Sequence, residues 1–278
     1  MAATPAFAHP SADPSATPSA PSAPATTPRC LIDAGAGGVV TVTLDNGRLN
    51  LLTGEAAGIY TEALRELAHD PAIRLLVLRG GPAAFLGGAD IKFLKDAGKR
   101  DIDTYIRGVF ALCEQIRDLP FPTMSVMSGY CLGAGMEVAA MCDIKIASHD
   151  ARFGMPEVKL GVPSVIHAAM LPGLIGWGRT RDLLISGRMI GAQHACDWGL
   201  VTDVAPEGGL EQRVEAWRQE LLGGAPVAMR IQKDLIRQWE RMPLQEAISV
   251  GIAGLVSAYD TSEPKEYMEH FLRARKRA

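Results

Sequence analysis

The sequence has few cysteines, and it lacks the cysteine and histidine spacings that build metal sites or disulfide frameworks. The number of cysteines, five, is odd, and no C-x-x-C pair occurs. The six histidines form no H-E-x-x-H motif. Several cysteines lie in apolar stretches, which favours buried thiols in a reducing cytoplasm over disulfides. We therefore expect a cytoplasmic protein without a metal site. The cysteines are Cys30, Cys113, Cys131, Cys142 and Cys196.

Long apolar runs and an excess of positive charge are also missing. The sequence has no run of about 18 apolar residues, the length that a membrane-spanning helix needs. Its formal net charge is −3, without a basic stripe of the kind that binds nucleic acid. Hydrophobic residues make up 47% and charged residues 21%, as in ordinary globular proteins. We therefore expect neither a membrane span nor a nucleic-acid partner.

The first 28 residues contain no lysine or arginine and no long apolar stretch. A secretory signal needs a basic start and an apolar middle, and a transit peptide needs arginines, so neither is expected. The segment is mostly Ala, Pro, Ser and Thr, a composition that buries too little apolar surface to offset the entropy lost on ordering. Residues 1–28 are therefore predicted to form a disordered tail.

After this tail, short β-branched or fully apolar segments alternate with segments of helical periodicity. This alternation predicts an α/β fold with mainly parallel strands. From Arg179 onward the helical signal dominates, so we expect a core over residues 29–205 and a helical region over residues 206–278. The expected strands cover 39–44, 75–78, 123–127 and 144–147, and the expected helices cover 54–69, 101–118, 133–141, 226–241 and 244–259.

Three segments have glycines or acidic residues at positions that ordinary loops do not require. In segment 83–94, A-A-F-L-G-G-A-D-I-K-F-L, the pair Gly87-Gly88 permits close approach of a ligand, although a tight loop has the same composition. In segment 151–161, A-R-F-G-M-P-E-V-K-L-G, Glu157 follows a proline, an arrangement that is also common at ordinary helix starts.

Segment 128–143, S-G-Y-C-L-G-A-G-M-E-V-A-A-M-C-D, passes from a strand into an apolar helix. The small residues around Ala134 at the helix start leave N–H groups free, and these groups favour an anion or a developing oxyanion. Glu137 lies in the first turn of this helix, where a surface glutamate is also favoured by the helix dipole. The residues around Glu137 are apolar, however, so we expect burial to raise its pKa into the range that suits acid–base chemistry.

Taken together in this order, these segments resemble the crotonase superfamily, also called the enoyl-CoA hydratase/isomerase family. The likeness extends over roughly residues 37–273 and includes the later stretch T-R-D-L-L-I-S-G-R-M-I-G-A-Q-H-A-C-D-W-G-L-V at 180–201. The resemblance implies a spiral of repeated ββα units followed by a helical trimerisation region. It also implies enoyl-CoA hydratase activity, in which water adds reversibly to a 2-enoyl-CoA thioester.

The resemblance assigns roles to individual residues. Glu137 is expected to orient and deprotonate the attacking water, and Glu157, at the matching distance along the chain, is expected to protonate the α-carbon. The backbone N–H groups of Ala89 and Ala134 are expected to form the oxyanion hole. No metal or redox cofactor is implied, because CoA arrives with the substrate. The residues expected to contact CoA or substrate are Ala89, Asp90, Ile91, Lys92, Gly133 and Ala134.

The stretch V-P-S-V-I-H-A-A-M-L-P at 162–172 departs from the glycine-rich pattern of many hydratases. This departure puts the acyl preference in doubt more than the reaction class. His167 is interpreted as a satisfied helix histidine, with a third polar group in the site as the alternative. The alternatives for the whole protein are an enoyl-CoA isomerase, another specialised crotonase reaction, or a non-catalytic CoA-binding protein. The last is disfavoured because both glutamates are present, and a serine hydrolase is disfavoured because no G-x-S-x-G motif occurs.

The resemblance also implies a homotrimer or a homohexamer with the C-terminal helices in the subunit contacts. On this interpretation Tyr267, His270 and Phe271 meet the active site or CoA pocket of a neighbouring subunit.

Overall fold

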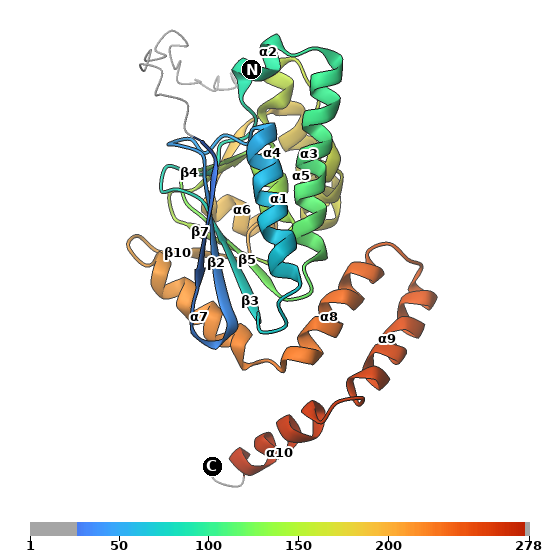
Figure 1. Cartoon of the computed structure of the whole chain (residues 1–278). Helices are drawn as coiled ribbons and strands as arrows, with labels where there is room; N and C mark the ends of the chain where they lie inside the picture. The colour runs from blue at the N-terminus through green and yellow to red at the C-terminus, as the bar shows by residue number, and fades with distance from the viewer. Residues whose placement is uncertain (1–26, 276–278) are drawn as a thin grey trace, which may run out of the picture.

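The computed structural model describes residues 27–275 and has two sheets with helices packed around them (Figure 1). In this part of the chain a six-stranded sheet has the order β1-β2-β3-β5-β7-β10, and a four-stranded sheet has the order β4-β6-β8-β9. The strands are β1 (Arg29–Ala34), β2 (Val39–Asp45), β3 (Leu75–Arg79), β4 (Ala84–Leu86), β5 (Thr123–Met127), β6 (Tyr130–Leu132), β7 (Ile144–Ser148), β8 (Arg152–Gly154), β9 (Met189–Gly191) and β10 (Asp203–Ala205).

From β3 to β8, consecutive strands alternate between the two sheets. In the pairs β3–β4, β5–β6 and β7–β8, the first strand joins the larger sheet and the second joins the smaller sheet. The strands from β2 to β10 in the larger sheet are parallel, as the alternation of strands and helices predicted. The predicted spiral of ββα units is therefore confirmed. Strand β1 was not predicted; it pairs antiparallel with β2 at the edge of the sheet, where most of its residues are exposed.

The helices of the core form where the sequence places capping residues and apolar faces. Thr53 caps α1, which begins where the sequence predicted a helix, by accepting a hydrogen bond from the Ala56 amide at 3.1 Å. Helix α1 packs against α3, and α4 is buried along most of its length. The helical elements of the core are α1 (Gly54–Ala68), α2 (Ile91–Asp96), α3 (Lys99–Asp118), α4 (Ala134–Ala140), η2 (Pro156–Leu160), η3 (Ile166–Met170), α5 (Leu171–Ser186) and α6 (Ala192–Trp198).

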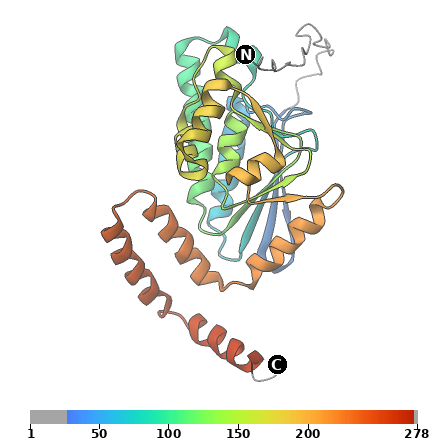
Figure 2. The ribbon, with the colours of Figure 1, turned by 180° about the vertical axis from the view of Figure 1, so that it is seen from behind.

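The C-terminal quarter is helical, as predicted. Helix α7 (Leu210–Gly223) packs on the six-stranded sheet through Val214, which belongs to an apolar cluster with Val39 and Leu75. The next three helices, α8 (Pro226–Trp239), α9 (Leu244–Ala258) and α10 (Glu263–Arg275), form an arm (Figures 1 and 2). Helices α8 and α9 pack side by side, whereas α10 extends away from the core.

The five cysteines are free thiols, three of them buried. Among residues 27–275 the helices are all too short or too polar to cross a membrane. Apart from residues 27 and 28, the segment predicted to be a disordered tail lies outside the described residues.

A buried lysine anchors the arm to the core. The ammonium of Lys233 on α8 donates to the Phe121 carbonyl at 3.0 Å and to Asp143 Oδ2 at 2.8 Å. Asp143 in turn accepts from the Thr123 amide at 2.7 Å, at the start of the central strand β5. These bonds join three separate parts of the chain, and the lysine is 9% exposed.

We predict that Lys233→Met lowers the free energy of unfolding by about 2 kcal/mol. Removing one partner of a buried ion pair leaves the other uncompensated, and the partial exposure of Asp143 reduces the loss below the value for a fully buried pair. Urea denaturation followed by circular dichroism measures the change. The matched control is Lys95→Met at an exposed position of α2, where we expect a change within about 0.5 kcal/mol. Equal urea midpoints for Lys233→Met and Lys95→Met would show that the contacts of Lys233 do not stabilise the fold.

Candidate active site

The site begins at Gly133, which joins β6 to α4. Its backbone has φ +52°, a conformation that favours glycine. A Cβ at this position would overlap the Oε1 atom of Glu157, so the carboxyl group lies directly against the start of the helix. The Gly133 amide donates to the Gly154 carbonyl at 2.9 Å, which ties this helix start to β8. The positive φ therefore favours glycine here, and any side chain would also displace the Glu157 carboxyl.

A second glycine brings another loop to the same place. Gly88 has φ +92°, and a Cβ there would stand 2.9 Å from the Leu132 carbonyl. The Gly88 carbonyl accepts a hydrogen bond from the Leu52 amide at 2.8 Å. This close approach of backbones brings Ala89, the next residue, near Ala134, which lies two residues after Leu132. Within residues 27–275, no acceptor is assigned to the amide of either alanine.

Glu137 is buried beside this junction, with only 5% of its surface exposed. Its Oε1 atom accepts a hydrogen bond from the amide of Ala168 at 2.9 Å. Burial raises the pKa of Glu137 to about 8; the Ala168 amide opposes this shift, and the negative charge of Glu157 adds to it. The expectation that burial would raise this pKa is thus met, and Glu137 holds a proton at neutral pH in the free protein.

Glu157 lies in the short helix η2 and is partly buried. Pro156 occupies the first position of η2, where its missing N–H costs nothing. The hydroxyl of Ser164 donates to Glu157 Oε2 at 2.9 Å. The fold therefore brings together the two glutamates that stand 20 residues apart, one from α4 and one from η2.

Residues 164–168 contact both glutamates, through the Ser164 hydroxyl and the Ala168 amide. Between them, Ile166 has φ +42°, a conformation that is strained for a β-branched residue and costs on the order of 1–3 kcal/mol. The sequence marked this stretch as a departure from the family pattern, but it did not indicate either contact. The polar side chains of Ser164 and His167 in an otherwise apolar stretch were the available signals.

Two further residues near the glutamates were missed. Tyr105 on α3 is buried and donates from its hydroxyl to the Leu52 carbonyl at 3.1 Å. Burial raises its pKa, and the charges of Glu137 and Glu157 raise it further, which places the phenol near both carboxyls. Glu114, also on α3, bonds His167, which lies next to Ala168.

The predicted CoA-contacting residues after Ala89 form the start of α2. Asp90 caps this helix by accepting from the Lys92 amide at 2.9 Å, so its side chain has a local structural role. Ile91 and Lys92 are exposed at the surface. Their contact with CoA remains a prediction.

Comparison with known proteins identifies the family of the chain. The family model described as enoyl-CoA hydratase/isomerase matches residues 34–278. A protein of Mycobacterium bovis named probable enoyl-CoA hydratase echA8 is 32% identical over 239 residues, which cover 86% of this chain and 92% of the relative. The carnitinyl-CoA dehydratase of Salmonella typhi is 29% identical over 225 residues, which cover 80% of this chain and 86% of the relative.

A solved structure shows the same fold. The crystal structure of an enoyl-CoA hydratase from Bacillus anthracis matches with a TM-score of 0.84 at 26% identity, covering 88% of this chain and 96% of that chain. The architecture is thus that of the crotonase fold. The chain belongs to the enoyl-CoA hydratase/isomerase family, as its glycine-rich segments indicated.

We predict that Glu137→Gln stabilises the protein at neutral and alkaline pH. The pKa of Glu137 is about 8 in the folded state, against 4.5 for an ordinary glutamate, so the unfolded chain releases this proton at lower pH. The free energy of unfolding of the wild type therefore falls as pH rises from about 4.5 to about 8, in total by on the order of 5 kcal/mol. Glutamine does not titrate, so the variant does not lose this stability. Urea denaturation at pH 4, 6 and 8 measures the difference.

The advantage of the glutamine variant should be smallest at pH 4, where both states of the wild type hold the proton. A constant difference across the three pH values would contradict the raised pKa.

Proposed function

We propose that the protein adds water to the double bond of a 2-enoyl-CoA thioester and catalyses the reverse dehydration of a 3-hydroxyacyl-CoA. One observation carries this proposal: the charge of Glu157 acts on the buried carboxyl of Glu137, and Glu157 lies against the start of α4. In residues 27–275 no acceptor is found for the amides of Ala89 and Ala134, which begin or precede the neighbouring helices. The pair can exchange protons with a substrate, and the amides can receive a thioester oxygen. Membership of the family supports the acyl-CoA substrate class.

The two amides activate the thioester. When the carbonyl oxygen accepts hydrogen bonds from Ala89 and Ala134, electron density moves from the double bond toward that oxygen. The β-carbon becomes electrophilic, and the developing enolate is stabilised. Each preorganised donor of this type contributes roughly 10²- to 10³-fold in related acyl chemistry. The position of Ala134 at the start of α4 adds the favourable end of the helix dipole.

The two carboxyls move the protons. Water adds its oxygen to the β-carbon and gives one proton to Glu137, while Glu157 gives a proton to the α-carbon. The double bond is consumed, and the pair still holds one proton, now on Glu137. Glu137 is also the residue that holds the proton when no substrate is bound, because burial raises the pKa of Glu137 to about 8. The proton passes back from Glu137 to Glu157 before the next addition, as expected for two carboxyls that titrate as a coupled pair.

The CoA group is bound, in this proposal, by the surface that follows Ala89. Asp90 holds the first turn of α2 in place, and the exposed residues Ile91 and Lys92 lie next to it. The Lys92 ammonium supplies positive charge for the nucleotide phosphates. No cofactor is required besides the CoA that is part of the substrate.

We predict that Glu137→Gln and Glu157→Gln each lower kcat for hydration by about 10²- to 10⁴-fold, while acyl-CoA binding persists. Glutamine keeps the shape of the side chain but cannot transfer the proton. The measurement is the loss of absorbance of the conjugated thioester, with crotonyl-CoA and a panel of longer, branched and aromatic enoyl-CoAs. The matched control is Glu55→Gln, an exposed residue in the first turn of α1.

Rates near those of the wild type in either variant would exclude the two-glutamate mechanism. If the wild type binds the panel but hydrates no member, the reaction is instead an isomerisation or another specialised reaction of the family.

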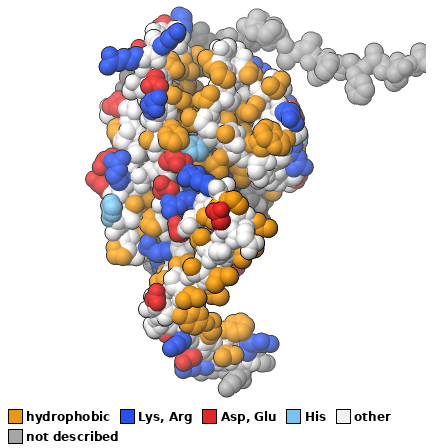
Figure 3. Space-filling view, turned by 90° about the vertical axis from the view of Figure 1, so that its right-hand side faces the viewer, with side chains coloured by type: hydrophobic (Ala, Val, Ile, Leu, Met, Phe, Trp, Pro, Cys, Tyr) orange, Lys and Arg blue, Asp and Glu red, His pale blue; other side chains and the backbone are white. Residues whose placement is uncertain are grey.

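We further propose that the chain assembles as a homotrimer or as a homohexamer of two trimers. The arm has large apolar side chains facing solvent, and orange side chains gather on it at the bottom of Figure 3. Leu255 and Val256 on α9 are 67% and 66% exposed, and Phe271 on α10 is 60% exposed. A monomer rarely exposes such a row, so burial against another subunit is expected. On this proposal Tyr267, His270 and Phe271 contact the neighbour's active site or CoA pocket.

Light scattering coupled to size-exclusion chromatography tests the assembly. We expect three or six times the mass of the chain at micromolar concentration. Replacing Leu255 and Phe271 together with aspartate should release monomers, since charged groups in an apolar contact are costly to bury. A wild type that is strictly monomeric at this concentration would contradict the proposal.

A further inference from the structure

Residues 164–168, which we call the carboxylate clamp, contact both glutamates of the site. At one end Ser164 Oγ donates to Glu157 Oε2 at 2.9 Å, and at the other end the Ala168 amide donates to Glu137 Oε1 at 2.9 Å. The two donors are only four residues apart in a single turn of chain. The orientation of both carboxyls therefore depends on the conformation of this one segment.

The conformation of the clamp is not one that its residues prefer. Ile166 has φ +42°, which a β-branched side chain disfavours. Such a conformation persists only where surrounding contacts determine it. Ile166 itself packs against the core only in part, so another contact must hold the turn.

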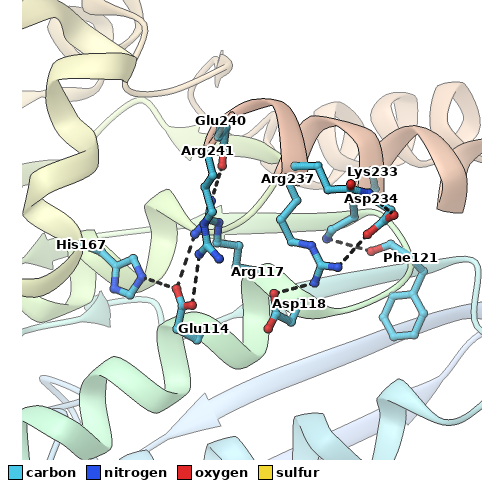
Figure 4. Close-up of polar contacts among 11 residues, drawn as sticks. Glu114, Arg117, Asp118, Phe121, His167, Lys233, Asp234, Arg237, Glu240 and Arg241 are labelled. Carbon is cyan, nitrogen blue, oxygen red and sulfur yellow. Dashed lines mark hydrogen bonds and ion pairs between the residues drawn. The ribbon is translucent and has the colours of Figure 1, made fainter. Parts of the chain in front are cut away.

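His167 provides that contact. Its side chain is buried, and its Nε2 atom lies 2.8 Å from Glu114 Oε1 on α3. Figure 4 marks this contact with a dashed line. The ring stacks on Phe110, also on α3, with centroids 5.5 Å apart and planes 21° apart. Glu114 is itself held by Arg117 at 3.6 Å and by Arg241 at 3.3 Å. His167 thus binds the turn to α3, and the next residue, Ala168, has the amide that donates to Glu137.

The second ring nitrogen argues against a simple packing role. Nδ1 of His167 is buried without a hydrogen-bond partner in the described part of the chain. A buried polar atom without a partner costs stability, and an apolar side chain would fill the same space without that cost. What the imidazole adds is therefore the directed bond to Glu114. The sequence predicted a histidine with its hydrogen bonds satisfied; this holds for Nε2, which contacts Glu114, but not for Nδ1.

From these contacts we propose that Ser164 and His167 are positioning residues, which orient Glu157 and Glu137 respectively, with Glu114 as the anchor of His167. The kinetic consequence rests on the proposed hydratase function, but the orientation of the carboxyls does not. The other charged group that acts on Glu137 is Glu157 on η2, which raises the pKa of Glu137. The charge of Glu137 in turn raises the pKa of Tyr105 and of Cys113, both on α3.

The first test follows the Glu137 carboxyl directly and needs no turnover. Protein labelled with ¹³C in the glutamate side chains is titrated by NMR, with Glu137→Gln identifying the signal. The wild-type midpoint is expected near 8. In His167→Leu the Ala168 amide is no longer fixed on the carboxylate, so the charged form loses its hydrogen bond and the midpoint rises. His167→Gln keeps a donor near the position of Nε2 and should restore the wild-type midpoint.

The second test is hydration kinetics on the same enoyl-CoA panel. We expect His167→Leu to lower kcat by roughly 10- to 100-fold with little change in KM, because a misplaced catalytic group costs rate more than binding. Ser164→Ala should lower kcat about tenfold, the equivalent of one lost hydrogen bond. His167→Gln should lie within about threefold of the wild type. The matched control is His149→Leu, in the exposed turn after β7.

If His167→Leu does not fold, Glu114→Ala is the alternative variant. It removes the partner of His167 Nε2, and the Glu114 side chain is 25% exposed, so its loss disturbs the core less. An unchanged Glu137 midpoint, together with kcat within about twofold of the wild type in the anchor variant and in Ser164→Ala, would overturn the proposal. A wild type that hydrates nothing would refute the proposed function, but the midpoints would still decide whether the anchor positions Glu137.

Discussion

The site depends on one close backbone approach, that of Gly88 to the Leu132 carbonyl. A side chain at position 88 would leave only 2.9 Å between its Cβ and that oxygen. The contact joins the loop after β4 to the end of β6, and thus two successive turns of the spiral. It places Ala89 from one turn beside Ala134 from the next. The start of α4, and with it Glu137, is fixed by the same contact.

Burial of Glu137 is the second constraint, and it acts against stability. The carboxyl lies inside an apolar helix because α4 passes through the interior of the core, in contact with β4, β6 and α3. No lysine or arginine is paired with it in the described part of the chain. The fold therefore tolerates a group that is easier to keep protonated than charged. A carboxyl whose pKa lies near neutral pH is suited to proton transfer.

Much of this arrangement was readable from the sequence, because it depends on local patterns. The strands β2, β3, β5 and β7 were predicted to within one residue, since β-branched and apolar runs bounded by turns are unambiguous signals. Strand β1 was missed because its apolar run is only three residues long, and β4, β6, β8, β9 and β10 were missed because each is only three residues long. Glu137 and Glu157 were identified from segments that resemble a known family, and not from spacing alone.

The contacts that support the two glutamates could not be predicted from the sequence. The Ala168 amide is 31 residues from Glu137 in the chain, and Glu114 is 53 residues from His167. Neither pair has a local sequence pattern, because each is created by packing between separate elements. The residues that hold a catalytic group are therefore harder to predict than the group itself.

One property of the two amides at Ala89 and Ala134 has an evolutionary consequence. They belong to the main chain, so a point mutation that changes a side chain leaves the donors in place. On the proposed function, loss of both carboxyls would still leave two backbone donors for a thioester oxygen. If these amides activate a carbonyl as proposed, new reactions can arise on this scaffold by exchange of the surrounding acids and bases, while the backbone donors, which depend on the whole fold, stay as they are.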